Sequence, residues 1–342
     1  MASRRKGPPR STPTLQQVAR VAGVSIATAS RVVTGTVPVS PDRRARVEQA
    51  VALLGYVPDE RARDLRRNAQ KAVGLIIPTL GSPLYASVFR LLHRRLQDDG
   101  FTLLAFESEA DRDSERAAVE VLVRSHARAV IVAAATGLAP DVMQLLRRRD
   151  IRVVFFDDRP PEPGAICVCI DDRAGARLLT EHLVGLGHTR IGLISGSLDG
   201  STGVDRHAGY IEALDAAGIT PDPELVRGFD WRLETGQRAT AELLDLERPP
   251  TALLATDPVL TAGALLEVRE RRLVVPDDLS LASFFESDHI RYVDPAITCL
   301  TGMDEGIAAA IVAELDGEPA AGRVDVPFVP SYRGSTAAPR VA

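Results

Sequence analysis

Short, fully apolar segments recur along the chain from residue 72 onward, and longer segments with apolar positions at helical spacing separate them. Continuous rather than alternating apolar strands indicate parallel sheets covered by helices on both faces. These strands are too many for one sheet, so we expect two doubly wound subdomains with a ligand cleft at the carboxyl ends of their strands. The short segments predict strands at residues 73–77, 101–106, 129–133, 153–156, 166–170, 190–194, 225–227, 252–255 and 279–282. The longer ones predict helices at residues 84–99, 115–126, 175–185, 206–217, 236–244 and 262–271, with one more ending at residue 149.

Residues 12–58 follow a different pattern, with three short segments of helical spacing. Thr14 and Gln17 have the spacing of a capping box at the start of the first helix, and Gly23 ends that helix. Ser25 can cap the second helix, and a serine-proline pair precedes the third. Three short helices with a tight turn between the first two predict an all-α helix-turn-helix unit.

Two segments outside these elements predict no stable structure of their own. Residues 1–11 are rich in Arg, Pro, Ser and Gly and are typical of a disordered basic arm. Residues 59–70 have helical character, but only Ala62 and Leu65 are apolar. Because one leucine cannot hold a helix onto a core, we expect this segment to be a solvated linker in isolation.

The charge distribution changes the picture that the net charge gives. The whole chain of 342 residues carries −5, but residues 1–70 hold 13 Lys and Arg against five Asp and Glu. The head therefore carries +8 and the body −13. A basic head on an acidic body favours a polyanion-binding module joined to another domain, with a solvated basic tail as the simpler alternative.

Composition argues against several other classes of protein. No run of about 18 apolar residues predicts a membrane helix, and the basic N-terminus lacks the apolar segment of a secretory signal. Three cysteines are too few for a disulfide framework, which suggests a reducing cytoplasm.

No catalytic or metal-binding motif stands out. Neither lysine follows a glycine of a Walker-type phosphate loop, and the six histidines form no His-Glu-x-x-His motif. Cys167 and Cys169 lack a second pair of zinc ligands, and two buried thiols on one strand are the simpler interpretation. The loop from Gly196 to Gly203 lacks the spacing of a dinucleotide fingerprint. We expect a protein that is not an enzyme and that carries no cofactor or metal.

The segment from Thr14 to Leu65 closely resembles the lactose/galactose repressor (LacI/GalR) family of bacterial transcription regulators. Three stretches of the body are also similar to the family: EHLVGLGHTRIGLISG from Glu181, DRHAGYIEAL from Asp205 and VPDDLSLASF from Val275. The resemblance implies a cytoplasmic homodimeric repressor that binds a pseudo-palindromic operator on double-stranded DNA. It also implies allosteric control by a small molecule, a sugar or sugar-like metabolite, bound in a periplasmic-binding-protein-like core. A sugar-binding protein without a transcriptional role is the alternative.

The resemblance also implies a division of the chain. A helix-turn-helix domain occupies residues 12–58, a hinge residues 59–70, and an effector-binding and dimerisation core residues 71–342. Within the core, we expect subdomain 1 at about residues 72–165 plus 300–322, and subdomain 2 at about residues 166–299 plus 323–337.

In this family the second helix enters the major groove, and a hinge leucine wedges into the minor groove. The positions that carry over to the major groove are Ser25, Ile26, Ala27, Thr28 and Arg31. Arginine can bind guanine through two hydrogen bonds, whereas isoleucine and alanine offer only apolar contact. The positions that carry over to the minor groove and hinge are Ala62, Arg63, Leu65 and Arg66.

The family's effector positions carry over with two departures. They are Tyr85, Asp158, Arg159, Arg206, Trp231, Asp257 and Phe285, and the assignment between Asp157 and Asp158 stays open. Arg206 is the strongest candidate, because an arginine at a helix start is unfavourable for the dipole and requires a partner. The chain has Thr256 where the family often has Asn, and Phe285 where it often has a ligand-gripping Asp. Either Glu286 replaces that carboxylate or the effector carries fewer hydroxyls than a typical sugar.

Overall fold

The computed structural model describes residues 14–34, 39–54, 72–134, 137–159, 165–317 and 322–340. The chain divides into two compact units, Met1–Arg67 and Asn68–Ala342. Within the described ranges, no helix has both the length and the apolar character needed to cross a bilayer.

The first unit contains three helices, α1 (Leu15–Ala22), α2 (Ile26–Thr34) and α3 (Pro41–Leu54). The predicted capping box is present: the Thr14 backbone N–H donates to Gln17 Oε1 at 2.7 Å, and the Gln17 N–H donates back to Thr14 Oγ1 at 3.3 Å. Gly23 ends α1 with a φ of 61°, a left-handed conformation that glycine adopts without a steric cost. The small core beneath these helices consists of Val18, Ala22, Val47 and Ala50, with Val24, Val32, Val33, Val51 and Leu54 packed around it.

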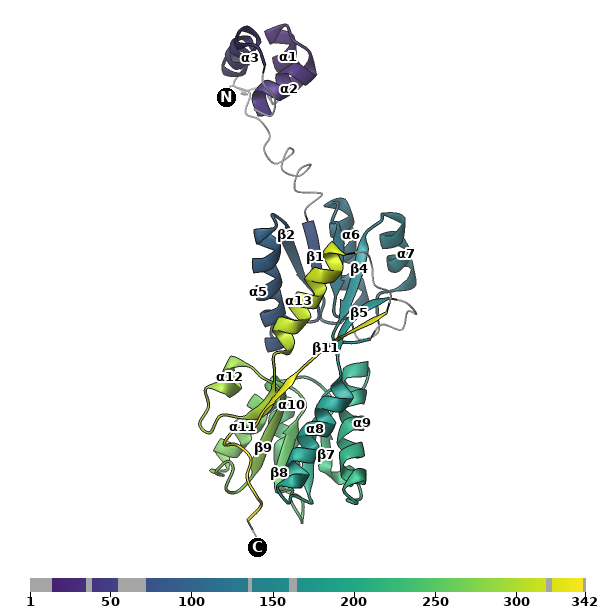
Figure 1. The fold of residues 1–342 in the computed structure, drawn as a ribbon, viewed down its shortest axis with the longest axis vertical. Helices are drawn as coiled ribbons and strands as arrows, with labels where there is room; N and C mark the ends of the chain where they lie inside the picture. The colour runs from purple at the N-terminus through teal and green to yellow at the C-terminus, as the bar shows by residue number, and fades with distance from the viewer. Residues whose placement is uncertain are drawn as a thin grey trace, which may run out of the picture. The chain divides into compact units, whose positions relative to one another are not determined.

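The second unit is built on two six-stranded sheets (Figure 1). The first sheet has the order β11-β5-β4-β3-β1-β2 and is parallel throughout. The second has the order β12-β10-β9-β8-β6-β7 and is parallel except for β12, which pairs antiparallel with β10. The prediction of two doubly wound parallel sheets is therefore confirmed. The strands are β1 (Ala72–Ile77), β2 (Thr102–Glu107), β3 (Ala129–Val132), β4 (Arg152–Phe156), β5 (Ile166–Ile170), β6 (Ile191–Ser195), β7 (Val226–Gly228), β8 (Ala252–Ala255), β9 (Ser280–Phe285), β10 (Thr298–Thr301), β11 (Arg323–Val326) and β12 (Val329–Ser331).

The division between the two subdomains differs from the sequence boundaries at two strands. We expected residues 166–170 and 323–326 in subdomain 2, but β5 pairs with β4 and β11 pairs with β5, so both belong to the first sheet. The described residues between β4 and β5, 157–159 and 165, form no helix, and on the sequence this connection resembles a domain boundary. Hydrogen bonding between strands decides sheet membership, and that pairing is not local in the sequence.

Helices cover both faces of each sheet, as continuous apolar strands require. Buried residues of α5 and α13 share one apolar cluster with the first sheet, and those of α6 and α7 form another with its opposite face. In the second sheet, α8 and α9 pack together on one face, and α10 and α11 contribute to the cluster on the other. The helices are α5 (Pro83–Asp98), α6 (Arg112–Arg124), α7 (Pro140–Arg148), α8 (Asp172–Gly185), α9 (Ser201–Ala216), α10 (Leu233–Leu244), α11 (Pro258–Glu270), α12 (Asp288–Arg291) and α13 (Met303–Asp316), with a 3-10 turn at Pro223–Leu225.

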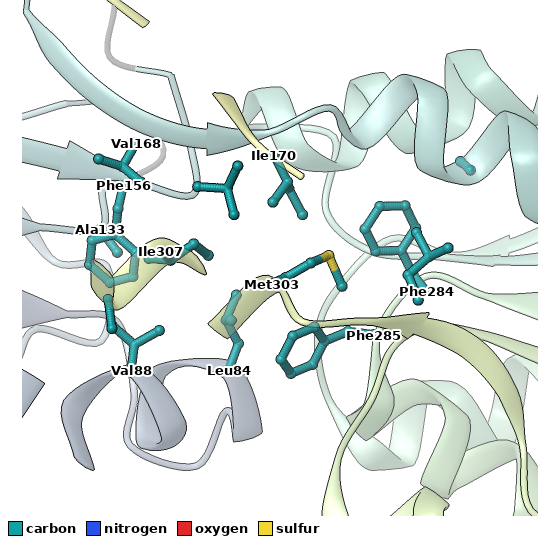
Figure 2. Close-up of a cluster of buried hydrophobic side chains, with 14 of the residues drawn as sticks. Leu84, Val88, Ala133, Phe156, Val168, Ile170, Phe284, Phe285, Met303 and Ile307 are labelled. Carbon is teal, nitrogen blue, oxygen red and sulfur yellow. The ribbon is translucent and has the colours of Figure 1, made fainter. Parts of the chain in front are cut away.

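One apolar cluster runs continuously from the first sheet into the second (Figure 2). Phe284 and Phe285, at the end of β9, share it with Ile170 from β5, Leu84 from α5 and Met303 from α13. Because these side chains are all buried, the two sheets meet through packed apolar surface beside the carboxyl ends of their strands.

Candidate functional site

Polar side chains gather where the parallel strands of both sheets end. Asp157 follows β4, and Thr256 with Asp257 follow β8. Since parallel strands end at the same edge of a sheet, these loops lie together in the manner typical of ligand sites on doubly wound folds.

Arg206 is the centre of this group. Its Nε donates to Asp172 Oδ1 at 2.7 Å, and its Nη1 donates to the carbonyl oxygen of Thr256 at 2.6 Å. Its guanidinium carbon lies 3.9 Å from the ring centroid of Phe284 and 5.7 Å from that of Trp231. Burial alone would lower the pKa of Arg206, but the carboxylates around it, Asp172 first, raise the pKa overall. The guanidinium is therefore a fixed, buried positive charge.

The sequence argument for Arg206 used the wrong local structure. Helix α9 begins at Ser201, so Arg206 lies in its second turn and not at its start. The partner that it requires is Asp172, in the first turn of α8, which the sequence argument missed. The available signal was a pair of acids, Asp171 and Asp172, directly after the strand β5.

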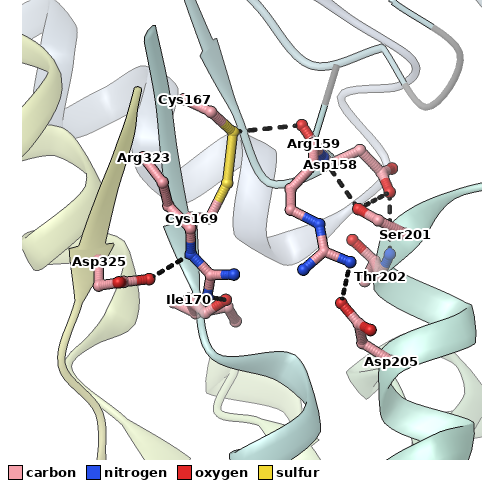
Figure 3. The surroundings of a disulfide bond; sticks show 10 residues. All are labelled: Asp158, Arg159, Cys167, Cys169, Ile170, Ser201, Thr202, Asp205, Arg323 and Asp325. Atoms are coloured by element: carbon pink, nitrogen blue, oxygen red, sulfur yellow. Dashed lines mark hydrogen bonds and ion pairs between the residues drawn. A yellow bond between two sulfur atoms is a disulfide. The ribbon is translucent and has the colours of Figure 1, made fainter. Parts of the chain in front are cut away.

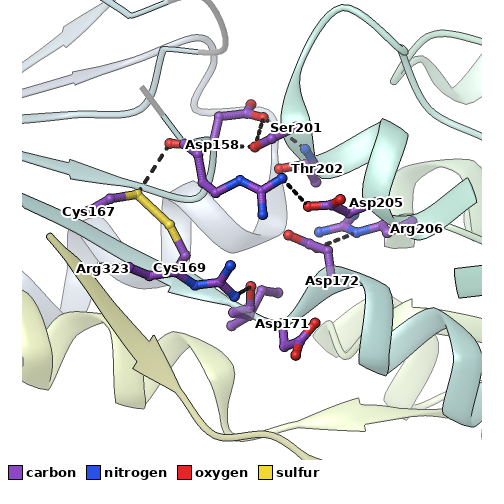
Figure 4. Close-up of polar contacts among 12 residues, drawn as sticks. Asp158, Cys167, Cys169, Asp171, Asp172, Ser201, Thr202, Asp205, Arg206 and Arg323 are labelled. Atoms are coloured by element: carbon purple, nitrogen blue, oxygen red, sulfur yellow. Dashed lines mark hydrogen bonds and ion pairs between the residues drawn. A yellow bond between two sulfur atoms is a disulfide. The ribbon is translucent and has the colours of Figure 1, made fainter. Parts of the chain in front are cut away.

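Asp157 and Asp158, adjacent in the chain, have different environments. Asp157 is 7% exposed and accepts a hydrogen bond from the Tyr85 hydroxyl at 2.8 Å, while its Oδ1 is buried without a partner. Asp158 Oδ1 instead accepts from the Ser201 hydroxyl at 3.1 Å and from the Thr202 backbone N–H at 2.9 Å (Figure 4). Asp158 thus holds the start of α9, and Asp157 retains one free acceptor.

Burial dominates the electrostatics of these carboxyl groups. It raises the pKa of Asp157 to about 6, helped by the negative charge of Asp158, and it raises the pKa of Asp172 to about 7 against the opposing effect of Arg206. Burial also raises the pKa of Asp257, whose Oδ1 caps α11 by accepting from the Val259 N–H at 2.7 Å. The site therefore holds more carboxyl groups than cations.

The remaining predicted positions occupy the edge of the same group. Arg159 pairs with Asp205 at 2.6 Å, and its backbone N–H donates to Ser201 Oγ at 2.9 Å. Trp231 is 37% exposed and covers Gly196, where an added Cβ would lie 2.0 Å from the indole.

The contacts of Phe285 and Glu286 bear on whether either residue takes the place of the family's ligand-gripping Asp. Phe285 is 6% exposed and belongs to the apolar cluster between the sheets. Glu286 forms an ion pair with Arg333. Its carboxylate therefore already has a cationic partner, which argues against its replacing the family's Asp.

The prediction that Cys167 and Cys169 are free thiols was wrong. We expected two buried thiols on one strand, whereas the structure joins Cys167 and Cys169 of β5 in a disulfide with an S–S distance of 2.35 Å (Figure 3). Cys299 of β10 is buried with a free thiol. In the part of the chain that the structure describes, no group of three or more potential ligands is placed to hold a metal ion.

In the first unit, the predicted groove-reading residues lie along α2, with Ser25 to Thr28 at its start and Arg31 in its last turn. Ser25, Ile26 and Ala27 are exposed, as is Arg31 one turn later, and Thr28 is half-buried. The Ser25 hydroxyl caps the helix by accepting the Thr28 N–H at 3.1 Å. Ile26 is 50% exposed, which argues against a purely structural role for its side chain. The predicted hinge positions Ala62, Arg63, Leu65 and Arg66 lie outside the described residues.

Comparison with known proteins agrees with both halves of this description. Residues 14–59 match the family model described as bacterial regulatory proteins, lacI family, and residues 180–336 match that of the periplasmic binding protein-like domain. The transcriptional regulator GalR of Escherichia coli (strain K12) is 32% identical over 285 residues, which is 83% of each chain. The chain belongs to the LacI/GalR family. These matches confirm the predicted family and the predicted fold class. Members of this family are DNA-binding transcription regulators and not enzymes, which confirms the prediction that the protein is not an enzyme.

Solved structures support the same assignment. A complex of the transcriptional regulator CelR with cellobiose is 29% identical, with a TM-score of 0.68, and the match covers 94% of this chain and 99% of that one. The lac repressor dimer bound to operator and the anti-inducer ONPF has a TM-score of 0.76 and covers 96% of this chain and 100% of that one. At 24% identity, this second likeness supports the fold alone. The chain is accordingly a LacI/GalR regulator with an effector domain.

Proposed function

We propose that this LacI/GalR regulator is a cytoplasmic repressor that binds a pseudo-palindromic operator as a homodimer. The observation that carries this proposal is the exposed start of α2, where Ser25, Ile26 and Ala27 precede Arg31 on a capped helix. Arg31 supplies a bidentate contact to guanine, and Ile26 and Ala27 supply apolar contacts to thymine methyl groups. We therefore expect each operator half-site to place a guanine opposite Arg31 and thymines opposite Ile26 and Ala27.

The hinge, residues 59–70, forms a helix on the operator in this proposal. Leu65 from each subunit wedges into the minor groove, where the cost of unstacking is offset by additional contacts. Ala62 allows two such helices to approach closely, and Arg63 and Arg66 lie along the phosphates. Such a helix, with so little apolar surface, requires DNA and a second hinge to be stable.

The operator proposal is tested with duplexes selected from a random library and measured by fluorescence anisotropy. Leu65→Ala should weaken binding to the selected operator while leaving binding to unrelated DNA nearly unchanged. Leu53→Ala is the matched control, because Leu53 is 76% exposed on α3 and has no proposed role. Equal weakening on both DNAs at one salt concentration would contradict the wedge.

The group of residues around Arg206 is proposed as the effector site. Asp157, Asp158, Asp172 and Asp257 outnumber the one buried cation of the group, so the site disfavours a phosphate or carboxylate on the ligand. The free Oδ1 of Asp157 favours a ligand that donates hydrogen bonds. An uncharged sugar or sugar-like molecule, bound between Trp231 and these carboxyl groups, satisfies both conditions.

Titration of Trp231 fluorescence tests this ligand class. Galactose and cellobiose are compared with galactose 6-phosphate, and we expect a response to an uncharged sugar that Arg206→Met abolishes. Tighter binding of the phosphorylated sugar would contradict the charge argument. Binding then changes the closure of the two subdomains and the order of the hinges, with a coupling of about 1–3 kcal/mol that is typical of such regulators.

The alternative is a sugar-binding protein without a transcriptional role. The two functions differ in one measurement, since only a repressor binds operator DNA with a steep dependence on salt. A homodimer that binds no DNA at low salt would leave the alternative as the better description.

A further inference from the structure

The pair Cys167 and Cys169 lies on the strand that connects the two halves of the effector site. Residues i and i+2 of a strand share one face, and here both sulfur atoms enter the apolar cluster beside α6 and α7. The intervening Val168 faces the opposite cluster. Cys167 is 4% exposed and Cys169 1% exposed.

One end of this strand contacts the start of α9 through Asp158. The Cys167 sulfur lies 3.4 Å from the carbonyl oxygen of Asp158, and the carboxylate of Asp158 accepts from Ser201 and Thr202 (Figure 3). A thiol can donate a hydrogen bond to that carbonyl, but a disulfide sulfur carries no hydrogen. The oxidation state therefore decides whether β5 is hydrogen-bonded to this loop at Cys167.

The other end of the strand leads to Arg206. β5 ends at Ile170, and Asp172, two residues later, binds the Arg206 guanidinium. The disulfide brings the Cα atoms of Cys167 and Cys169 to 5.9 Å. Reduction therefore removes a covalent constraint from β5 next to the carboxylate that fixes Arg206.

We propose that Cys167 and Cys169 form a reversible redox-modification site whose state adjusts the effector site. A regulator that works on bacterial DNA meets a reducing compartment, and disulfides there are usually transient or redox-sensing. The oxidant is a peroxide. One cysteine thiolate attacks a peroxide oxygen, the O–O bond breaks, and a sulfenic acid and water form. The second thiol then attacks that sulfur, so that the S–S bond forms, the S–O bond breaks and a second water leaves.

Reversal requires a dithiol such as dithiothreitol, which is oxidised while both cysteine thiols are restored. The effect of this reaction on operator affinity rests on the proposed function. Formation of the disulfide and its effect on Arg206 do not, and the experiment separates the two.

The first measurement counts free thiols with DTNB in denaturant, after treatment of the full-length protein with hydrogen peroxide or dithiothreitol. The chain has three cysteines. We expect one reactive thiol, Cys299, after oxidation and three after reduction. In Cys299→Ser, the counts should be zero and two. Three thiols remaining after oxidation of the native chain would overturn the proposal.

The second measurement uses Trp231, the only tryptophan, as a reporter of Arg206. In Cys299→Ser, the emission of Trp231 should differ between the two redox forms, and operator affinity should differ by about fivefold or more. The double variant Cys167→Ser/Cys169→Ser should show neither difference. If it fails to fold, the comparison of reduced and oxidised Cys299→Ser still decides the matter.

A disulfide that forms without changing either the emission or the operator affinity would overturn the regulatory part of the proposal. A change in emission in a protein that binds no operator in either form would support the redox site and refute the repressor function instead.

Discussion

The buried pair of Arg206 and Asp172 permits a sharp prediction about Arg206→Met. Both residues are 4% exposed, and their side chains are joined at 2.7 Å. Methionine retains an apolar stem but removes the charge, which leaves a buried carboxylate without its cation. Breaking a buried pair in this way typically costs about 3–5 kcal/mol. We expect the free energy of unfolding of the second unit to fall by that amount near neutral pH.

Removal of the partner carboxylate, in Asp172→Asn, should lower the free energy of unfolding by less than Arg206→Met does. In Asp172→Asn, the guanidinium keeps its bond to the Thr256 carbonyl and the favourable charge of Asp157, which also raises the pKa of Arg206. Because the site has several carboxyl groups and one buried cation, losing the cation is the more severe change. The double variant should recover part of the loss, since both buried charges are then removed.

The cost of Arg206→Met should also depend on pH. The folded pKa of Asp172, about 7, lies above its ordinary value of 3.8, so the neutral carboxyl stabilises the fold at low pH and this stability is lost as pH rises toward 7. Without Arg206 the pKa rises further, and the loss continues above pH 7. Above pH 7, the free energy of unfolding of the variant should therefore fall, relative to that of the native chain, by about 1.4 kcal/mol per pH unit for each carboxyl that stays protonated in the folded state.

Urea unfolding at pH 6 and pH 8, at one protein concentration, measures these differences. Trp231 fluorescence reports the second unit, and circular dichroism reports the whole chain. A cost that is the same at both pH values, or an equal cost for Asp172→Asn, would refute the description of Arg206 as the buried cation that compensates these carboxyl groups.

The remaining predictions concern four single positions. Gly209→Ala should destabilise the protein by about 1–3 kcal/mol in urea unfolding, because the new Cβ would lie 2.1 Å from a backbone oxygen of α8. Gly185→Ala, with nothing within 4 Å, should be neutral or stabilising by up to about 1 kcal/mol, and an equal loss at both positions would contradict the close helix contact. Gly196→Ala should displace the indole of Trp231 and shift its emission; an unchanged spectrum would refute that contact. Asp157→Asn should flatten the decline in stability from pH 4 to 6, since burial raises the pKa of this carboxyl to about 6 and an amide does not titrate; an unaltered pH profile would count against this.

Local sequence pattern was sufficient for the helices of the head and for most strands. The Thr14–Gln17 capping box is completed within one helical turn, and strand β5 has the predicted bounds 166–170. Both features depend on neighbours a few residues apart, which a single sequence displays directly. The resemblance to the LacI/GalR family added positions such as Arg206, which the structure places at the centre of the site.

Only the tertiary structure decided how these elements combine. The sheet that contains β5 and β11, the pairing of Asp172 with Arg206, and the separate environments of Asp157 and Asp158 all depend on contacts between segments distant along the chain. The bond between Cys167 and Cys169 joins near neighbours, but the pattern of residues did not reveal it, because an extended strand normally holds such sulfurs apart. The apolar and polar pattern specifies which residues are buried, whereas backbone pairing and burial of charge decide which of them meet and what charge they carry.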